Sequence, residues 1–302
     1  MKKNLLLKLY KNLQRFRSIE LEISKRYSSW KMRCPTHLSV GQEAVPAAFS
    51  EIVKKNDFAV SSHRAHAHYL AKGGNLNKMI AELYGKKTGC SKGKGGSMHL
   101  IDLSVNFMGS SAIVGNSIPV GTGLALSSKI KNTKQKSYVF FGDGALEQGV
   151  FYESVNFAAV KNLPIIFVCE NNLYSVYSNM EHRQPTNRKN FKMVEAIGVK
   201  SLLCDGNNVE QCYKIFKKAV AYVEKKSKPI FLEFLTYRHL EHCGPNIDDN
   251  LKYRPKKEIE LWKRKDPILV VRKKIFKSYQ KEIKKFELKI NKEINYAFKF
   301  AE

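Results

Sequence analysis

Two polar side chains of this sequence have the chemistry and the spacing of a metal-binding pair. Asp143 lies in a Gly-Asp-Gly turn directly after the apolar run 138–141, and Asn172 follows the apolar run 165–169. Because the carboxyl ends of parallel strands meet at one edge of a sheet, we expect both side chains at the same edge. A carboxylate and an amide oxygen are hard donors, which magnesium prefers. The pattern therefore predicts a magnesium site.

The residues around Asp143 also favour an anion. Gly142 and Gly144 let the backbone approach a ligand closely, and the helix predicted after them offers its first N–H groups. A magnesium ion that holds a diphosphate would use both features. The alternative is an ordinary strand–helix–strand crossover, in which Asp143 belongs to a turn and Asn172 is a capping residue.

The elements that must position these side chains form a βαβ unit. The two apolar runs are short, as buried parallel strands are. Between them, apolar residues recur at helical spacing until Pro164 ends the helix. Further strands are predicted at 58–60, 198–203 and 229–237, with helices between them. We therefore predict an α/β fold with a mostly parallel sheet and helices on both faces.

The pattern divides the chain into three segments. We expect an N-terminal helical segment at 1–34, the α/β domain at 35–267, and a C-terminal helical extension at 268–302 that a partner could cover. The amphipathic start lacks the apolar core and the cleavage site of a signal peptide. No stretch approaches the roughly 20 apolar residues of a membrane span. We expect a cytoplasmic protein that does not bind membranes.

The chain is strongly basic, with 53 Lys and Arg residues against 27 Asp and Glu residues and a formal net charge of +26. Such a charge raises the possibility of nucleic-acid binding. The basic residues are spread over the whole length, however, and no recognised nucleic-acid motif is present. We therefore predict no nucleic-acid partner, although a basic surface could steer an acidic subunit. The six cysteines show no CxxC or zinc-like spacing, which indicates that most of them are reduced packing residues.

The segment from Asp143 to Asn172 resembles the thiamine-diphosphate signature, in which GDG is followed, after one helix and one strand, by NN. Its residues GALEQGVFYESVNFAAVKNLPIIFVCENN are similar to the alpha chain of the first component of 2-oxo-acid dehydrogenase complexes, including the pyruvate and acetoin types. The motif HxxxGQEA at 37–44 and the loop GCSKGKGGSMH at 89–99 also resemble this family. The similarity covers roughly residues 36–267. It implies the diphosphate-binding half of a thiamine-diphosphate fold.

The resemblance implies a set of residues that bind magnesium and thiamine diphosphate. Asp143, Asn172 and the backbone oxygen of Tyr174 would hold the metal. Arg64 would pair with the diphosphate, and backbone groups of Ala112 and Val114 would meet the aminopyrimidine ring. The remaining positions implied for the cofactor are His63, Gly144, Ala145 and His242.

Two histidines are implied as catalytic residues, His66 and His242. His242 would approach the reacting centre and act in proton transfer or in stabilising developing charge. The loop around it departs from the mitochondrial pattern, because Glu241 replaces a glycine and Cys243 replaces a serine. That serine is a regulatory phosphorylation site in some members, so we predict no such control here. The departure leaves the substrate open.

The resemblance also implies a reaction and a partner. The reaction is decarboxylation of a 2-oxo acid, or cleavage of acetoin, followed by transfer of the fragment to a lipoyl-bearing acyltransferase or another acceptor. A beta chain would supply the glutamate that the cofactor needs, so we expect an α2β2 heterotetramer. The alternatives are the amino-terminal half of a split transketolase-like enzyme, a split 2-oxo-acid decarboxylase, and a cofactor-binding remnant with a scaffolding role.

Overall fold

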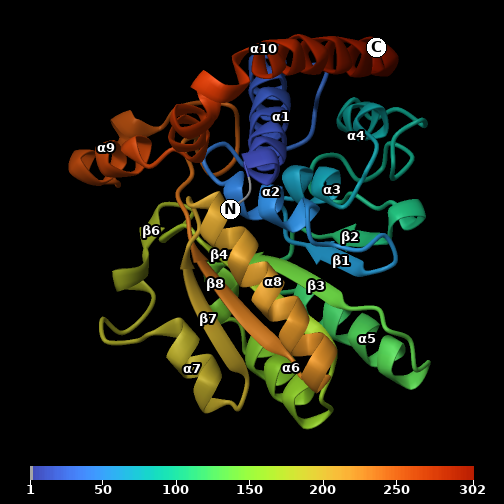
Figure 1. Cartoon of the computed structure of the whole chain (residues 1–302), viewed down its shortest axis with the longest axis vertical. Coiled ribbons are helices and arrows are strands. Elements are labelled where there is room, and N and C mark those ends of the chain that lie inside the picture. Colours follow the sequence, from blue (N-terminus) through green and yellow to red (C-terminus); the bar gives the residue numbers. More distant parts are fainter. Residues whose placement is uncertain (1–2) are drawn as a thin grey trace.

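A six-stranded parallel sheet organises the chain, in the computed structural model that describes residues 3–302. The strands are short, the central ones are buried, and each pairs in parallel with its neighbours. Their order in the sheet is β2 (Phe107–Ser110), β1 (Phe58–Ser61), β3 (Ser137–Gly142), β4 (Ile165–Asn171), β8 (Ile230–Leu235) and β7 (Lys200–Asp205) (Figure 1). The prediction of an α/β fold with a parallel sheet is confirmed. The edge strand β2 was not predicted.

Alternate residues of the central strands face two different cores. Along β3, Tyr138 and Phe140 pack in the larger core, whereas Val139 and Phe141 pack in the smaller one. All four side chains are buried because helices cover both faces of the sheet (Figure 1). This burial explains why the strands appear in the sequence as continuous apolar runs.

The helices on the two faces come from different parts of the chain. On the larger core lie α2 (Ala44–Ser50), α3 (His66–Ala71), α4 (Leu76–Leu83) and α8 (Val209–Lys226). On the smaller core lie α5 (Ser117–Ile130), α6 (Gly149–Val160) and α7 (Asn190–Ala196). A 3-10 turn at Asp143–Glu147 separates β3 from α6, so α6 begins later than the sequence predicts.

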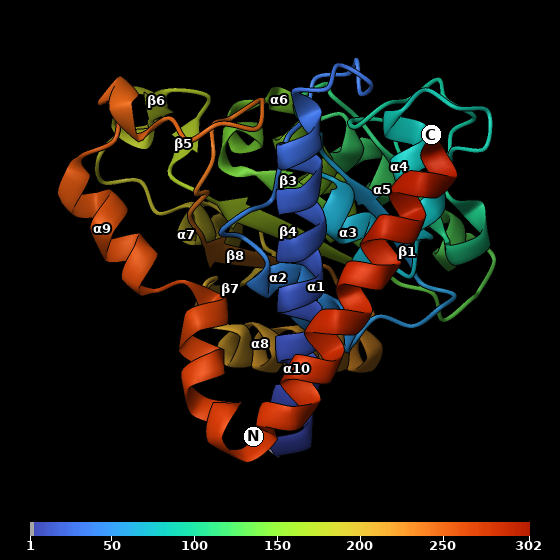
Figure 2. The same ribbon diagram turned by 90° about the horizontal axis from the view of Figure 1, so that it is seen from above.

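Two long helices cover the larger core at the ends of the chain. α1 (Lys3–Tyr27) lies beside α10 (Pro267–Ala301), and α10 also packs on α4 (Figure 2). An ion pair of 2.7 Å joins Arg15 to Glu293 across the two helices. The buried face of α10 is therefore used within the chain. Asp266 begins this helix, since its carboxylate accepts hydrogen bonds from the backbone N–H groups of Ile268 and Leu269.

The smaller elements lie mainly around the carboxyl ends of the strands. A short hairpin, β5 (Tyr174–Ser175) with β6 (Ser178–Asn179), follows β4, and α9 (Lys256–Arg264) precedes α10. Further 3-10 turns lie at Leu103–Val105, Met180–His182 and Asp249–Leu251. All six cysteines are free thiols. None of the helices within residues 3–302 is both long and apolar enough to cross a membrane.

Candidate active site

A cavity of about 170 Å³ opens at the carboxyl edge of the sheet. The parallel register sets Gly142 of β3 opposite Glu170 of β4, so the residues that follow the two strands meet at one rim. Asp143, Gly144, Ala145, Asn172 and Tyr174 line the cavity, as do Ala112 and Val114. The sequence-predicted oxygen donors thus lie together.

Asp143 and Asn172 are held by backbone hydrogen bonds as well as by their strands. The N–H of Asn172 donates to Oδ1 of Asp143 at 3.3 Å, and the N–H of Tyr174 donates to Oδ1 of Asn172 at 3.2 Å. Both side chains are buried. Leu173 and Val176 adopt left-handed φ values of 73° and 54°, an uncommon backbone conformation that turns the chain sharply past Asn172.

The two asparagines at the end of β4 have different roles. Asn171 donates from Nδ2 to Oε1 of the buried Glu233 at 2.8 Å, and its Oδ1 accepts from the N–H of Leu173 at 3.0 Å. Its amide is therefore used inside the fold. Asn172, one residue later, lines the cavity. Successive side chains of an extended segment point in opposite directions, so Asn171 and Asn172 face different surroundings.

Arg183, which no sequence pattern assigned to the site, pairs with the carboxylate of Asp143. Its guanidinium lies 2.5 Å from Oδ2 of Asp143 and also pairs with Glu147. Burial raises the pKa of Asp143, and the positive charge of Arg183 opposes that rise. Arg183 lies in the polar segment after the hairpin. No motif in that segment connects it to a residue 40 positions earlier.

Arg64 places a second positive charge at the cavity. It is buried at the end of β1, and its guanidinium donates to the backbone oxygens of Leu38 and His242, the latter at 3.2 Å. Burial lowers its pKa to about 10, which leaves it charged at neutral pH. A charged group in this position can attract an anionic ligand.

Three imidazole rings meet beside Arg64, from His37, His63 and His242. Their centroids are 4.5, 5.0 and 5.3 Å apart. Burial, reinforced by the charge of Arg64, lowers the pKa of His37 to about 2, of His63 to about 4 and of His242 to about 3. All three are therefore neutral at pH 7. His37 was not assigned to the site from sequence, although it begins the HxxxGQEA motif.

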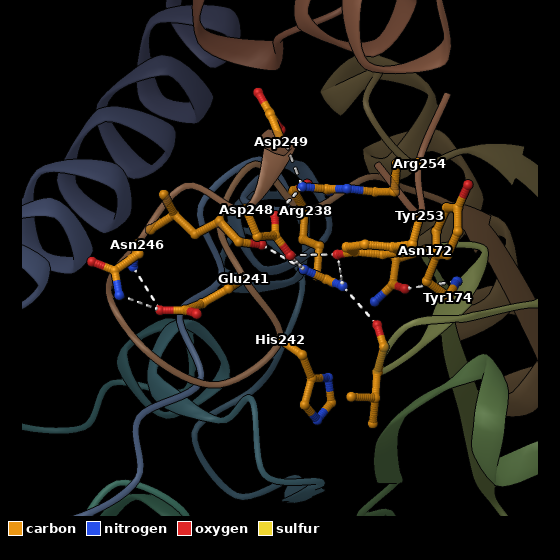
Figure 3. Close-up of polar contacts among 12 residues, drawn as sticks. Asn172, Tyr174, Arg238, Glu241, His242, Asn246, Asp248, Asp249, Tyr253 and Arg254 are labelled. Atoms are coloured by element: carbon orange, nitrogen blue, oxygen red, sulfur yellow. Dashed lines mark hydrogen bonds and ion pairs between the residues drawn. The ribbon is translucent and has the colours of Figure 1, made fainter. Parts of the chain in front are cut away.

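A buried ion network holds the segment that carries His242 (Figure 3). The carboxylate of Asp248 pairs with Arg238 at 3.3 Å and with Arg254, and it accepts a hydrogen bond from the hydroxyl of Tyr253. Arg238 also donates to the backbone oxygen of Val176 at 2.8 Å. We call these four side chains the clamp, because they join the His242 loop to the turn after Asn172.

Comparison with known proteins identifies the family. A model of the family described as dehydrogenase E1 component matches residues 11–302. The chain belongs to this family.

The relatives of this E1 chain are alpha subunits. The chain is 38% identical to the pyruvate dehydrogenase E1 component subunit alpha of Rickettsia felis, over 98% of its own length and 90% of that protein. It is 34% identical to the mitochondrial somatic form of this alpha subunit from Homo sapiens, over 98% of this chain and 75% of that protein. It is 35% identical to the chloroplastic subunit alpha-3 of Arabidopsis thaliana, over 98% of this chain and 70% of that protein. The resemblance to alpha chains of dehydrogenase first components is confirmed, and the chain is part of an oxidoreductase.

One residue implied as catalytic lies apart from the others in this E1 chain. His66 is buried outside the lining of the cavity, with Nε2 2.8 Å from Oγ of Ser97 and Nδ1 3.3 Å from Oε1 of Glu20. It starts α3, and its contacts join that helix to α1. A direct catalytic role for His66 stays a prediction, and its contacts favour a positioning role.

The neighbouring His68 connects the cavity with the core of the E1 chain. Its Nδ1 lies 2.8 Å from Oγ of Ser61, and its Nε2 lies 3.1 Å from Oε2 of Glu170, which lines the cavity. Two positions apart on a helix, His66 and His68 point in different directions, as expected from the helical period.

Proposed function

We propose that this E1 alpha chain binds the diphosphate of thiamine diphosphate through magnesium and acts, together with a beta chain, on pyruvate. The observation that carries the proposal is the buried pair Asp143 and Asn172 on one rim, next to the charged Arg64. Members of this family generally use thiamine diphosphate. The pyruvate assignment rests on the names of the Rickettsia and human relatives, with acetoin as the other candidate.

The residues of the cavity fit this cofactor. Asp143 and Asn172 supply the hard oxygen donors that magnesium takes. The buried Oε1 of Glu170 lacks a hydrogen-bond partner within residues 3–302. The backbone is open at Gly142, where an added Cβ would meet nothing within 4 Å. Room for a ligand and unsatisfied polar groups thus coincide at this rim.

Each cavity residue has a distinct part in the proposal. Asp143, Asn172 and the carbonyl of Tyr174 would hold the metal. Arg64 and His63, with the backbone of Gly144 and Ala145, would bind the diphosphate, and Ala112 with Val114 would flank the aminopyrimidine ring. When bound, thiamine diphosphate supplies a carbanion and an electron sink for decarboxylation. His242, neutral at pH 7, would accept or return a proton at its imidazole nitrogen.

A beta partner is supported by an apolar surface near the cavity. Ile113 and Val114 are 66% and 47% exposed, Val114 lines the cavity, and Val120 at the start of α5 is 48% exposed. These three residues lie on the segment that leads from the cavity lining into α5. Exposed apolar side chains gathered in this way are typical of subunit interfaces. We infer that the partner approaches here and completes the cofactor site.

We expect the purified chain to show no thiamine-dependent oxidation of pyruvate until a beta chain is added. The reason is that no carboxylate for the aminopyrimidine is assigned within this chain. Activity would be measured with an artificial electron acceptor, for the chain alone and for the chain co-purified with a beta chain from the same organism. Full turnover by the single chain would contradict the heterotetramer. Turnover of acetoin but not of pyruvate would correct the substrate.

Arg183 leads to a prediction about metal affinity. Its guanidinium occupies Oδ2 of Asp143 and repels a cation there. Arg183→Gln should therefore strengthen magnesium-dependent binding of thiamine diphosphate by about three- to tenfold, the effect of one typical hydrogen bond of about 0.5 to 1.5 kcal/mol. Calorimetry on the complex with the beta chain measures this. The matched control is Arg188→Gln, since Arg188 lies on the same segment but donates to the hydroxyl of Tyr152. Weaker binding by Arg183→Gln would mean that Arg183 itself binds the cofactor.

A further inference from the structure

The cavity contains a second donor set, whose chemistry differs from that of the oxygen donors Asp143 and Asn172, which we call the oxygen rim. His37, His63 and His242 each offer a ring nitrogen, and these nitrogens all lie within 4.8 Å of one another. We propose that the three imidazoles form a binding site for a late transition-metal ion such as Zn²⁺, separate from the magnesium site at Asp143 and Asn172. Binding there needs no cofactor, so this inference does not depend on the proposed function.

The three histidines come from segments that only the fold brings together. His37 precedes α2, His63 follows β1, and His242 lies in the loop after β8. Figure 3 shows the His242 ring extending from its loop away from the clamp. In a tetrahedral zinc site with bonds of about 2.0–2.1 Å, ligand nitrogens are about 3.4 Å apart. The rings must therefore close by about 1 to 1.5 Å, which rotation about the side-chain bonds can supply.

His37 gives an independent indication that a ligand belongs in this site. Its side chain is almost wholly buried, with the residue 6% exposed, and its Nδ1 has no hydrogen-bond partner among the described residues. An unsatisfied polar atom in the interior costs free energy. A metal ion bound at this nitrogen would remove that cost.

The electrostatics of the cluster favour ligation by neutral imidazole. The lowered pKa values of the three rings keep them unprotonated at pH 7, which is the form that binds metal. Arg64, whose guanidinium contacts the backbone of His242, opposes a cation. The carboxylate of Glu170 lines the same cavity and offsets part of that charge. The donor set therefore suits Zn²⁺, Co²⁺ or Ni²⁺, whereas magnesium prefers the oxygen rim.

Occupation of this site has a consequence for the enzyme. The cavity measures about 170 Å³, and a metal with its fourth ligand would fill the part into which His63 and His242 point. Zn²⁺ should therefore compete with the ligand of the oxygen rim. Zn²⁺ at the three histidines would then inhibit the enzyme.

The experiment is a titration of the full chain with Co²⁺, followed by visible absorption spectroscopy. We expect an intense tetrahedral Co²⁺ spectrum with one equivalent bound, displaced by Zn²⁺. His63→Gln and His242→Gln should each weaken Co²⁺ binding by at least about tenfold, because each removes one of three ligands. The matched control is His99→Gln, since His99 is exposed and outside the cluster and its loss should leave the affinity unchanged.

Two further controls test whether the neighbouring thiol ligates the metal and whether the variants are folded. Cys243 is exposed next to His242 and could ligate Co²⁺, so Cys243→Ser should keep the spectrum. Circular dichroism and thermal melting establish that each histidine variant is folded. A weak octahedral spectrum, equal affinity in His63→Gln and the unmodified chain, or loss of the spectrum in Cys243→Ser would each overturn the site.

Discussion

Asp143→Ala is expected to abolish magnesium-dependent binding of thiamine diphosphate, with a loss of at least about 100-fold in affinity. The substitution removes the one carboxylate that the proposed metal site uses. It also leaves the guanidinium of Arg183, only 11% exposed, with Glu147 as its remaining anionic partner. Calorimetry with the alpha and beta chains together, at saturating magnesium, measures the loss.

Asn172→Ala should have a similar effect by a different route. It removes the amide oxygen from the rim and frees the N–H of Tyr174, whose carbonyl would complete the metal shell. The matched control is Asn171→Ala. That amide contacts Glu233 and not the cavity, so its loss should lower the melting temperature more than the affinity. If Asp143→Ala and Asn172→Ala both bind the cofactor as tightly as the unmodified protein, the metal assignment is wrong.

Asp248→Ala is expected to release the loop that carries His242. Its carboxylate is the shared anion of Arg238 and Arg254, and all three side chains are at least 97% buried. Removing one partner from a buried ion network costs about 3 to 5 kcal/mol, because the remaining charges stay uncompensated. We expect this cost to appear as local opening of residues 239–255, since both arginines can then reach water.

Hydrogen exchange across residues 239–255 measures that opening, and calorimetry measures its effect on cofactor binding. Asp248→Asn should rescue the loop in part, because an amide oxygen still accepts hydrogen bonds but carries no charge. Asp249→Ala is the matched control. Asp249 is the next residue and pairs with the exposed Lys263 at 2.6 Å and with Arg254 at 3.2 Å. Its carboxylate is 27% exposed and does not contact Arg238, so its loss should open the loop much less than the loss of Asp248. Protection of the loop that is unchanged in Asp248→Ala would show that the clamp does not hold it.

The fold class and the oxygen rim could be predicted because both depend on local pattern. The apolar runs before Asp143 and Asn172 are continuous where a strand is buried on both faces, and Pro164 ends the helix between them. Parallel strands joined by a helix have their carboxyl ends at one edge. The spacing of the two residues along the chain was therefore enough to place them on the same rim.

The remainder of the site depends on contacts between distant segments, which no local period encodes. Arg183 reaches Asp143 from 40 positions away, and His37 meets His242 across more than 200 residues. The helical period requires only that His66 and His68 diverge, and the packing of α3 against α1 decided that His66 is turned out of the cavity. The sequence alone determined the βαβ unit, the shared rim of Asp143 and Asn172, and the family. Only the tertiary structure decided which charges and rings face one another there, because burial pairs side chains by their position in space.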